Sequence, residues 1–242
     1  MKDTKYTFLD LDSMMLMGVD SHGGLKFIDD VPNGLDCNLK CPFCGSPFNA
    51  KNHGGIKAHH FAHTSGADCK QGHESVLPYF AKSIIDETKK IMLPRGIVYL
   101  NGSPLHESQE AVIKECSIIK PDNDKVGIVE ITTLRDKKIA IVIFIKEEDA
   151  WARREYALKN YENVIAINLS RYKKQPVEVM PILYKALNEN TLNRYWIKRY
   201  DELMIISKIK ELAIKRNELE EEGDFFYLYY QKLKRKLYCL AD

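Results

Sequence analysis

The chain has 242 residues, and 36 Lys and Arg stand against 34 Asp and Glu, so the formal net charge is only +2. No overall basic field marks a nucleic-acid-binding protein, and binding of that kind would have to come from a local patch. The longest apolar run, residues 139–145, is far too short to cross a bilayer, and acidic residues interrupt the N-terminal apolar residues. We therefore expect a cytoplasmic protein without membrane contact.

The first 72 residues are predicted to form a small strand-containing module. Residues 1–36 have the character of short strands and turns, with a Gly pair at 23–24. Residues 37–63 contain too many Pro and Gly for an ordinary hydrophobic domain, which is typical of a module held together by a metal. We expect the metal to replace the core.

The metal ligands are predicted from two short clusters. Cys41 and Cys44 form a C-x-x-C knuckle, and His60 and His63, three residues apart, would share one face of a turn. Two thiolates and two imidazoles suit a tetrahedral Zn²⁺ ion. Because a site with four protein ligands leaves no position for water, the zinc is predicted to be structural.

The fourth ligand stays open in the sequence. Cys37 or Cys69 could replace a histidine, and His59 is adjacent to the expected position. For the knuckle itself, the alternative is a redox pair or two buried cysteines. Neither alternative explains why so many Cys and His residues are concentrated in this region.

The middle of the chain alternates between helical and strand patterns. Residues 74–92 have apolar residues at helical spacing, and Pro94 closes that stretch. Beyond residue 176 the pattern becomes helical again. Between them we predict strands at 97–100, 111–119, 126–133 and 138–145, a helix at 148–161, and a strand at 163–169.

Asp122 and Glu130 are the candidate acidic pair. Pro121 and Asp122 lie between two strand-like runs, and Glu130 stands alone inside the second run. A buried carboxylate without a partner would take up a proton, so it must be paired, solvated or bound to a cation. In isolation, the Pro-Asp pair is typical of a hairpin turn and a lone Glu of an exposed strand face. Our hypothesis is a divalent cation.

Two sets of basic residues are candidates for binding DNA. Residues 225–240 interleave tyrosines with Lys and Arg, a pattern that could contact phosphates while the rings stack on unpaired bases. An amphipathic helix with its tyrosines packed inward is the alternative. The second set is Arg153, Arg154, Lys159, Arg171, Lys173 and Lys174.

These motifs together resemble the competence protein CoiA-like family. The resemblance rests on the Cys41 to Cys44 knuckle, the His60-Phe-Ala-His63 box, Cys69, the Glu74-Ser75 pair and Lys82, and it covers roughly residues 10–170. It implies an α/β protein with a PD-(D/E)XK restriction-endonuclease-like core of order αβββαβ. The implied organisation is a zinc-binding module at 1–72 and a nuclease-like core at 73–170, and the helical pattern beyond them predicts a helical extension at 171–242.

The resemblance also implies the catalytic residues. Glu74 would be the acid of the first core helix, with Lys82 two turns further on. Asp122 would begin the second core strand, and Glu130 would lie within it. Glu74, Asp122 and Glu130 would hold Mg²⁺ or Mn²⁺, while Lys82 and Thr132 would serve the attacking water and the phosphate.

Two residues depart from the family pattern. Pro78 stands where a histidine is usual, and Thr132 stands where Lys or Gln is common. Threonine can hydrogen-bond a water but supplies no positive charge for the transition state. This absence of charge limits how far the family's activity can be carried over.

The expected function is metal-dependent cleavage of DNA, including single-stranded DNA, in uptake, recombination or defence. The alternative is a catalytically inactive nucleic-acid-binding or protein-interaction module with the same fold, which Thr132 and Pro78 favour. A weaker alternative makes the zinc site itself hydrolytic, which requires one of its four ligands to be absent. A protein partner or a homo-oligomer is compatible with each expectation.

Overall fold

The computed structural model describes residues 6–13, 15–54, 58–64, 72–100, 102–121, 126–189 and 192–219. Its main feature is a mixed six-stranded sheet in the order β12, β11, β10, β9, β8, β5. Neighbouring strands are antiparallel except β10 and β11, which are parallel. The strands are β5 (Lys90–Leu93), β8 (Gln109–Ile119), β9 (Ile128–Thr133), β10 (Lys138–Phe144), β11 (Asn163–Asn168) and β12 (Arg194–Arg199).

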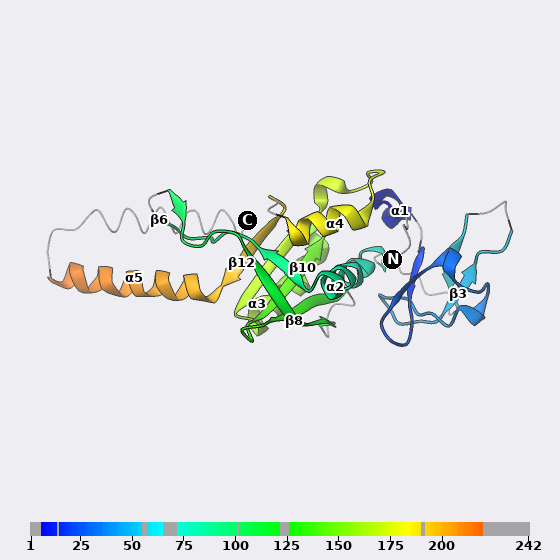
Figure 1. Cartoon of the computed structure of the whole chain (residues 1–242), viewed down its shortest axis with the longest axis horizontal. Helices are drawn as coiled ribbons and strands as arrows, with labels where there is room; N and C mark the ends of the chain where they lie inside the picture. The colour runs from blue at the N-terminus through cyan, green and yellow to red at the C-terminus, as the bar shows by residue number, and fades with distance from the viewer. Residues whose placement is uncertain are drawn as a thin grey trace.

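Helices cover both faces of this sheet because its strands alternate their apolar side chains. Val129 and Ile131 of β9 pack on one face with α2 (Leu77–Thr88) and α4 (Val179–Asn188). Ile128 packs on the other face with α3 (Glu147–Asn160). The period of two in the strand therefore separates two apolar cores. The long helix α5 (Tyr200–Leu219) extends away from the sheet (Figure 1).

The predicted order of helix, three strands, helix and strand is found in α2, β8, β9, β10, α3 and β11. Two predictions about individual elements are wrong. The helix expected at 74–92 ends at Thr88, because Lys89 adopts a left-handed conformation with φ 53° and the next four residues form β5 beside β8. The C-terminal third is not entirely helical, because β12 pairs with β11 and completes the sheet.

The N-terminal residues form a second, smaller unit at one end of the molecule (Figure 1). It has its own apolar core, which includes Ile28, Leu39 and the stacked rings of Phe48 and Phe61, 4.9 Å apart. The expectation that metal replaces the core is therefore wrong; a candidate metal group lies beside a small core. The elements here are β1 (Met17–Val19), β2 (Leu25–Phe27), β3 (Phe48–Lys51), β4 (His60–His63) and the 3₁₀ turns Ile28–Asp30 and Leu35–Cys37. The short helix α1 (Phe8–Ser13) packs instead with the main core beside α4 (Figure 1).

The remaining elements are short. The predicted strand at 97–100 appears as β6 (Tyr99–Leu100), which pairs with β7 (Ser103–Pro104). The two other 3₁₀ turns among the described residues are Gly72–Val76 and Ser170–Tyr172. No helix in the described part of the chain is both long and apolar enough to cross a membrane.

Candidate functional site

The cysteine knuckle is a closed turn. The backbone N–H of Gly45 donates to the Cys41 carbonyl at 2.9 Å, and the Cys41 N–H donates to the Ser46 carbonyl at 2.9 Å. Gly45 has φ 75°, a left-handed conformation that glycine adopts without strain. The turn therefore holds Cys41 and Cys44 side by side.

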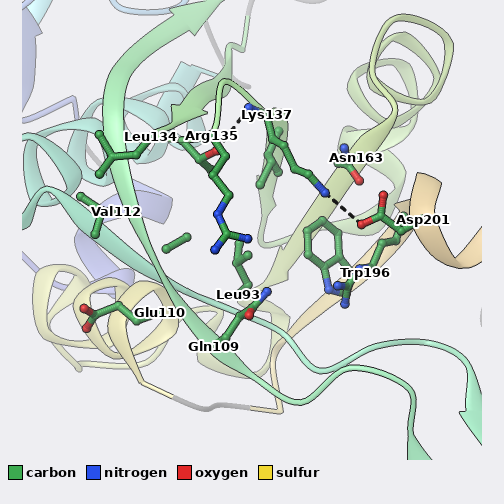
Figure 2. A pocket seen from close by; sticks show the side chains of 14 residues that line it. Leu93, Gln109, Glu110, Val112, Leu134, Arg135, Lys137, Asn163, Trp196 and Asp201 are labelled. Atoms are coloured by element: carbon green, nitrogen blue, oxygen red, sulfur yellow. Dashed lines mark hydrogen bonds and ion pairs between the residues drawn. The ribbon is translucent and has the colours of Figure 1, made fainter.

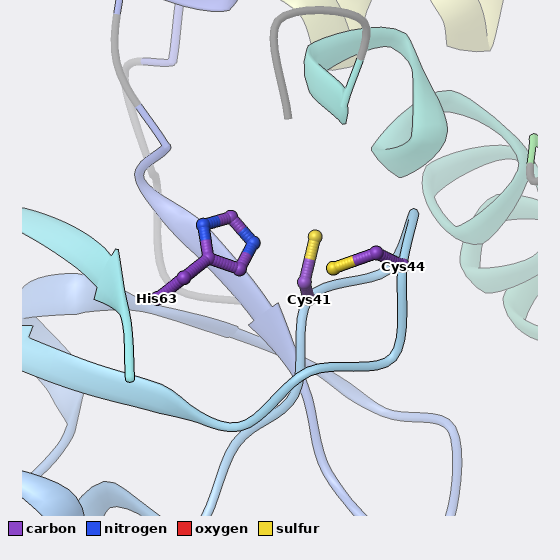
Figure 3. A group of neighbouring side chains, drawn as sticks. All are labelled: Cys41, Cys44 and His63. Atoms are coloured by element: carbon purple, nitrogen blue, oxygen red, sulfur yellow. The ribbon is translucent and has the colours of Figure 1, made fainter. Parts of the chain in front are cut away.

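His63 completes a group of three candidate metal ligands. One ligand atom each of Cys41, Cys44 and His63 lies within 4.8 Å of the other two (Figure 3). His63 Nε2 is buried without a hydrogen-bond partner in the described structure, as a nitrogen reserved for a metal would be. Two thiolates and one imidazole are the donor set that Zn²⁺ prefers, so the group could bind a metal such as zinc.

The environment of the cysteines also fits a cation. Burial raises the pKa of the Cys41 thiol, hydrogen bonds from the backbone N–H groups of Cys44 and Phe43 oppose the shift, and the charge of the Cys44 side chain adds to it. Two thiolates so close together need a neighbouring positive charge. A bound divalent ion would supply it and would keep both thiols deprotonated.

His60 is not part of this group. The turn expected at residues 60–63 is wrong, because these residues form strand β4 opposite β3. Residues three apart in a strand point to opposite faces. His63 faces the Phe48 ring at 5.1 Å, whereas His60 Nδ1 contacts the Ala58 carbonyl at 3.0 Å.

The structure removes two of the three alternatives for the fourth ligand. The Cys37 thiol donates to the Phe48 carbonyl at 3.4 Å inside the small core. His59 Nδ1 contacts the Asp29 carboxylate, which raises the pKa of this exposed histidine. Cys69 lies outside the described residues.

Replacing the two histidines separately should distinguish these positions. We expect His63→Ala to bind far less zinc than the roughly one equivalent of the parent protein, because it removes one of only a few ligands. His60→Ala is the matched control and should keep its zinc. The measurement is metal content by mass spectrometry after gel filtration. If the two variants lost equal amounts of zinc, the assignment of His63 would be wrong.

The knuckle also contacts the main sheet. Lys120, just beyond β8, donates from Nζ to the Pro42 carbonyl at 2.5 Å. Burial lowers the pKa of Lys120, and the nearby Cys41 and Cys44 act in the opposite direction. Burial and the Cys41 charge raise the pKa of Tyr79 on α2. The candidate metal group is therefore built against α2 and the end of β8.

Glu130 is compensated by local partners. Its Oε2 accepts a hydrogen bond from the Tyr161 hydroxyl at 2.6 Å, and its Oε1 lies 3.5 Å from Lys138 Nζ. Burial and the bond to Glu130 raise the pKa of Tyr161. Glu130 was expected to need a partner because it lies in an apolar strand. The fold supplies both a hydrogen-bond donor and a cation, Tyr161 and Lys138.

Glu74 lies near the other end of β10. Its Oε2 accepts from the backbone N–H of Ile145 at 3.4 Å and lies 3.9 Å from Arg153, a fully buried arginine of α3. Burial raises the pKa of Glu74, and Arg153 opposes that shift. Ala140, the cross-strand partner of Glu130, precedes Ile145 by five residues (140 to 145), or roughly 16 Å of strand. Glu74 and Glu130 are therefore separated along the sheet.

The other predicted catalytic residues are dispersed too. Lys82 forms an ion pair with Asp86 on the same helix. Thr132 is half-buried at the far end of β9, where it pairs with Lys138. Asp122 lies outside the described residues. The cysteine and histidine group is the only one within the described ranges whose side chains are placed to hold a metal ion.

The partners of the two acids could not be found from sequence spacing. Tyr161 follows Glu130 by 31 residues, and helix α2 and the strands β5 to β10 lie between Glu74 and Arg153 of α3 in the chain. The apolar character of β10 could be predicted from the sequence, because Ile139 to Phe144 contains no polar side chain. In the structure all six residues are buried. That strand offers no acid to either face of the sheet.

No family model matches the chain, and no curated protein or solved structure matches it.

Proposed function

We propose that this chain is a nucleic-acid-binding protein, with a PD-(D/E)XK-like core that has lost the arrangement of acids needed for cleavage and a structural zinc in the N-terminal module. The observation that carries the proposal is the separation of Glu74 from Glu130, each held by its own partners. Cleavage of a phosphodiester needs a divalent ion held by carboxylates that converge on one point. The backbone positions that the two acids adjoin, Ala140 for Glu130 and Ile145 for Glu74, are roughly 16 Å apart along β10, which is too far for both carboxylates to hold one ion.

The core order supports the same assignment of fold. Helix α2, the antiparallel strands β8, β9 and β10, helix α3 and the parallel strand β11 follow the order that the CoiA-like resemblance implies. A fold can persist after its catalytic residues are lost, because packing and site chemistry depend on different residues. Buried apolar side chains in β10 maintain the sheet without providing a ligand.

A cleft between the N-terminal module and the core is the proposed binding surface. It has a volume of ≈ 680 Å³, and we call it the module cleft; Leu25, Tyr79, Lys82, Asp86, Ser117 and Lys120 are among its lining residues. Asp86 pairs with Lys82, so Lys120 is the lysine that we propose for a phosphate contact. Lysines can contact phosphates, and a tyrosine ring can stack on an unpaired base. This combination favours a single strand of nucleic acid over a duplex.

A metal-dependent nuclease is the second candidate, and one observation favours it. Glu74 contacts Ile145 just beyond β10, and Ile119 pairs with Ile128 across the connection that carries Asp122. Val129 pairs with Ile141, so this connection and Ile145 are at the same end of the sheet. Glu74 and Asp122 would then hold Mg²⁺ or Mn²⁺ without Glu130, and the raised pKa of Glu74 is of the kind found in active sites.

One pair of assays separates the two candidates. We expect the protein to bind single-stranded DNA in fluorescence anisotropy and to cleave neither DNA nor RNA with Mg²⁺ or Mn²⁺. If cleavage is seen, Glu74→Gln should abolish it and Glu130→Gln should leave it nearly unchanged. Cleavage that depends on Glu74 would replace the binding proposal with the nuclease.

The binding surface needs its own control. Lys120→Gln should weaken binding several-fold and reduce its salt dependence, because one phosphate contact is lost. Lys208→Gln, on α5 and paired with Glu211 at 2.9 Å, should bind like the parent. Zinc content shows whether Lys120→Gln keeps the knuckle intact. Equal binding by both variants would exclude the module cleft.

A further inference from the structure

A second pocket lies at the opposite end of β9 from the connection carrying Asp122 (Figure 2). It has a volume of ≈ 290 Å³, near the lower limit of small-molecule sites. Strands β5, β8 and β12, the turn between β9 and β10, and the start of α5 form its walls. We call it the hairpin pocket; Leu93, Ala111, Arg135, Ile139, Trp196 and Asp201 are among its lining residues.

Part of the wall is apolar and fixed. Ile139 and Trp196 are buried, with 2% and 5% of their surface exposed, and Leu93 packs beside them. The Trp196 indole N–H donates to the Pro94 carbonyl at 2.9 Å, and the Arg199 guanidinium lies over the ring at 5.3 Å. This surface suits a small flat apolar group.

The charged residues of the hairpin pocket are paired, with Arg135 as the exception. Three pairs neutralise one another: Lys137 with Asp201 at 2.9 Å, Arg199 with Glu202 at 3.4 Å, and Glu110 with Lys90 at 2.7 Å. Arg135 has no acidic partner among the described residues, and its guanidinium points into the pocket (Figure 2). One positive charge is therefore left uncompensated.

The turn that carries Arg135 is anchored on both sides. Asp136 has φ 55° and forms an ion pair with Lys114 of β8 at 2.9 Å. The Leu134 N–H donates to the Val112 carbonyl at 3.1 Å, and Lys137 ties the turn to α5 through Asp201. The anchored turn fixes the backbone position from which Arg135 presents its guanidinium to the pocket.

We propose that the hairpin pocket binds a nucleoside monophosphate unit. Its phosphate pairs with the Arg135 guanidinium, whose planar fork matches phosphate oxygens. Its base lies on the apolar wall beside Trp196, and the amides of Gln109 and Asn163 border the same pocket. The unit is either a free nucleotide or the 5′-phosphorylated end of a strand. This site is separate from the module cleft and does not depend on it.

Calorimetry with defined probes tests the proposal. We expect AMP or CMP to bind the full-length protein, and adenosine, cytidine and inorganic phosphate to bind at least tenfold more weakly. Arg135→Gln should weaken the nucleotide at least tenfold, whereas Arg171→Gln, an exposed arginine on the Ser170–Tyr172 turn, should not. A short oligonucleotide with and without a 5′-phosphate identifies the source, because a strand end would depend on that phosphate.

Several results would overturn this inference. The inference is wrong if AMP and CMP do not bind. It is also wrong if the nucleoside binds as tightly as the nucleotide, or if inorganic phosphate does. An Arg135→Gln variant that melts like the parent and keeps its nucleotide affinity would also overturn it. Failure of the module cleft is distinguishable, since it follows Lys120→Gln and not Arg135→Gln.

Discussion

Replacing Cys41 with serine is expected to abolish zinc binding and to unfold most of the N-terminal unit, of which residues 15–54 and 58–64 are described. The small core of this unit is built around Phe48 and Phe61, directly beside the candidate ligands Cys41 and His63. Structural zinc contributes about 10–16 kcal/mol of apparent binding free energy in zinc-finger peptides, far more than so small a core supplies. Hydrogen exchange should show lost protection in β3 and β4 and unchanged protection in β9 and β10.

Cys37→Ser is the matched control for this experiment. Cys37 is buried in the same core but donates to the Phe48 carbonyl, a bond that a serine hydroxyl can also make. This variant should keep its zinc and lose only a modest part of its stability. A Cys41→Ser protein that stayed protected in β3 and β4 without zinc would contradict a structural metal. Loss of zinc from both variants would instead point to general unfolding.

The sequence contained enough to predict the knuckle because a C-x-x-C turn is local. Cys41 and Cys44 are brought together by the backbone of four residues and Gly45. The second histidine was mispredicted because three-residue spacing shares a face in a helical turn and not in a strand. Residues 60–63 form a strand because β3 pairs with them, and this partner is not encoded in their own spacing.

The order of the core elements was predictable for a similar reason. Alternating apolar residues in β9 and the helical stripe of α2 are local periodicities. Strand β12 has no such signal, since its six residues include three cations and are followed directly by α5. Its strand character comes from pairing with β11, so tertiary contacts decided it.

Glu74 and Glu130 lie apart for a reason that local pattern does not reveal. Glu130 and Glu74 were both identified as unusual, but a carboxylate near an apolar strand can be compensated by any partner that the fold brings to it. Here the partners are Tyr161 and Arg153. Sequence spacing does not reveal long-range partners of this kind, because they are set by the fold.

Glu202 is the side chain for which we expect the largest single loss of stability. It is fully buried at the start of α5, yet a carboxylate at this point looks like an ordinary solvated residue in the sequence. Its Oε2 accepts from the backbone N–H groups of Ile97 and Val98 at 2.7 and 2.8 Å, and its Oε1 lies 3.4 Å from Arg199. The absence of a side chain at Gly96 allows this approach, because a Cβ there would come within 2.0 Å of Oε1.

Glu202→Ala should therefore lower the free energy of unfolding by about 3–5 kcal/mol, because the buried Arg199 and two backbone donors lose their acceptor. Asp201→Asn is the matched control one residue earlier: its ion pair with Lys137 is solvent-exposed and should contribute less than about 1 kcal/mol. Urea denaturation of both variants measures the difference. Equal losses would mean that the Glu202 carboxylate does not fasten residues 97–98 to α5, and Glu202→Gln, which keeps an acceptor oxygen, should fall between the two.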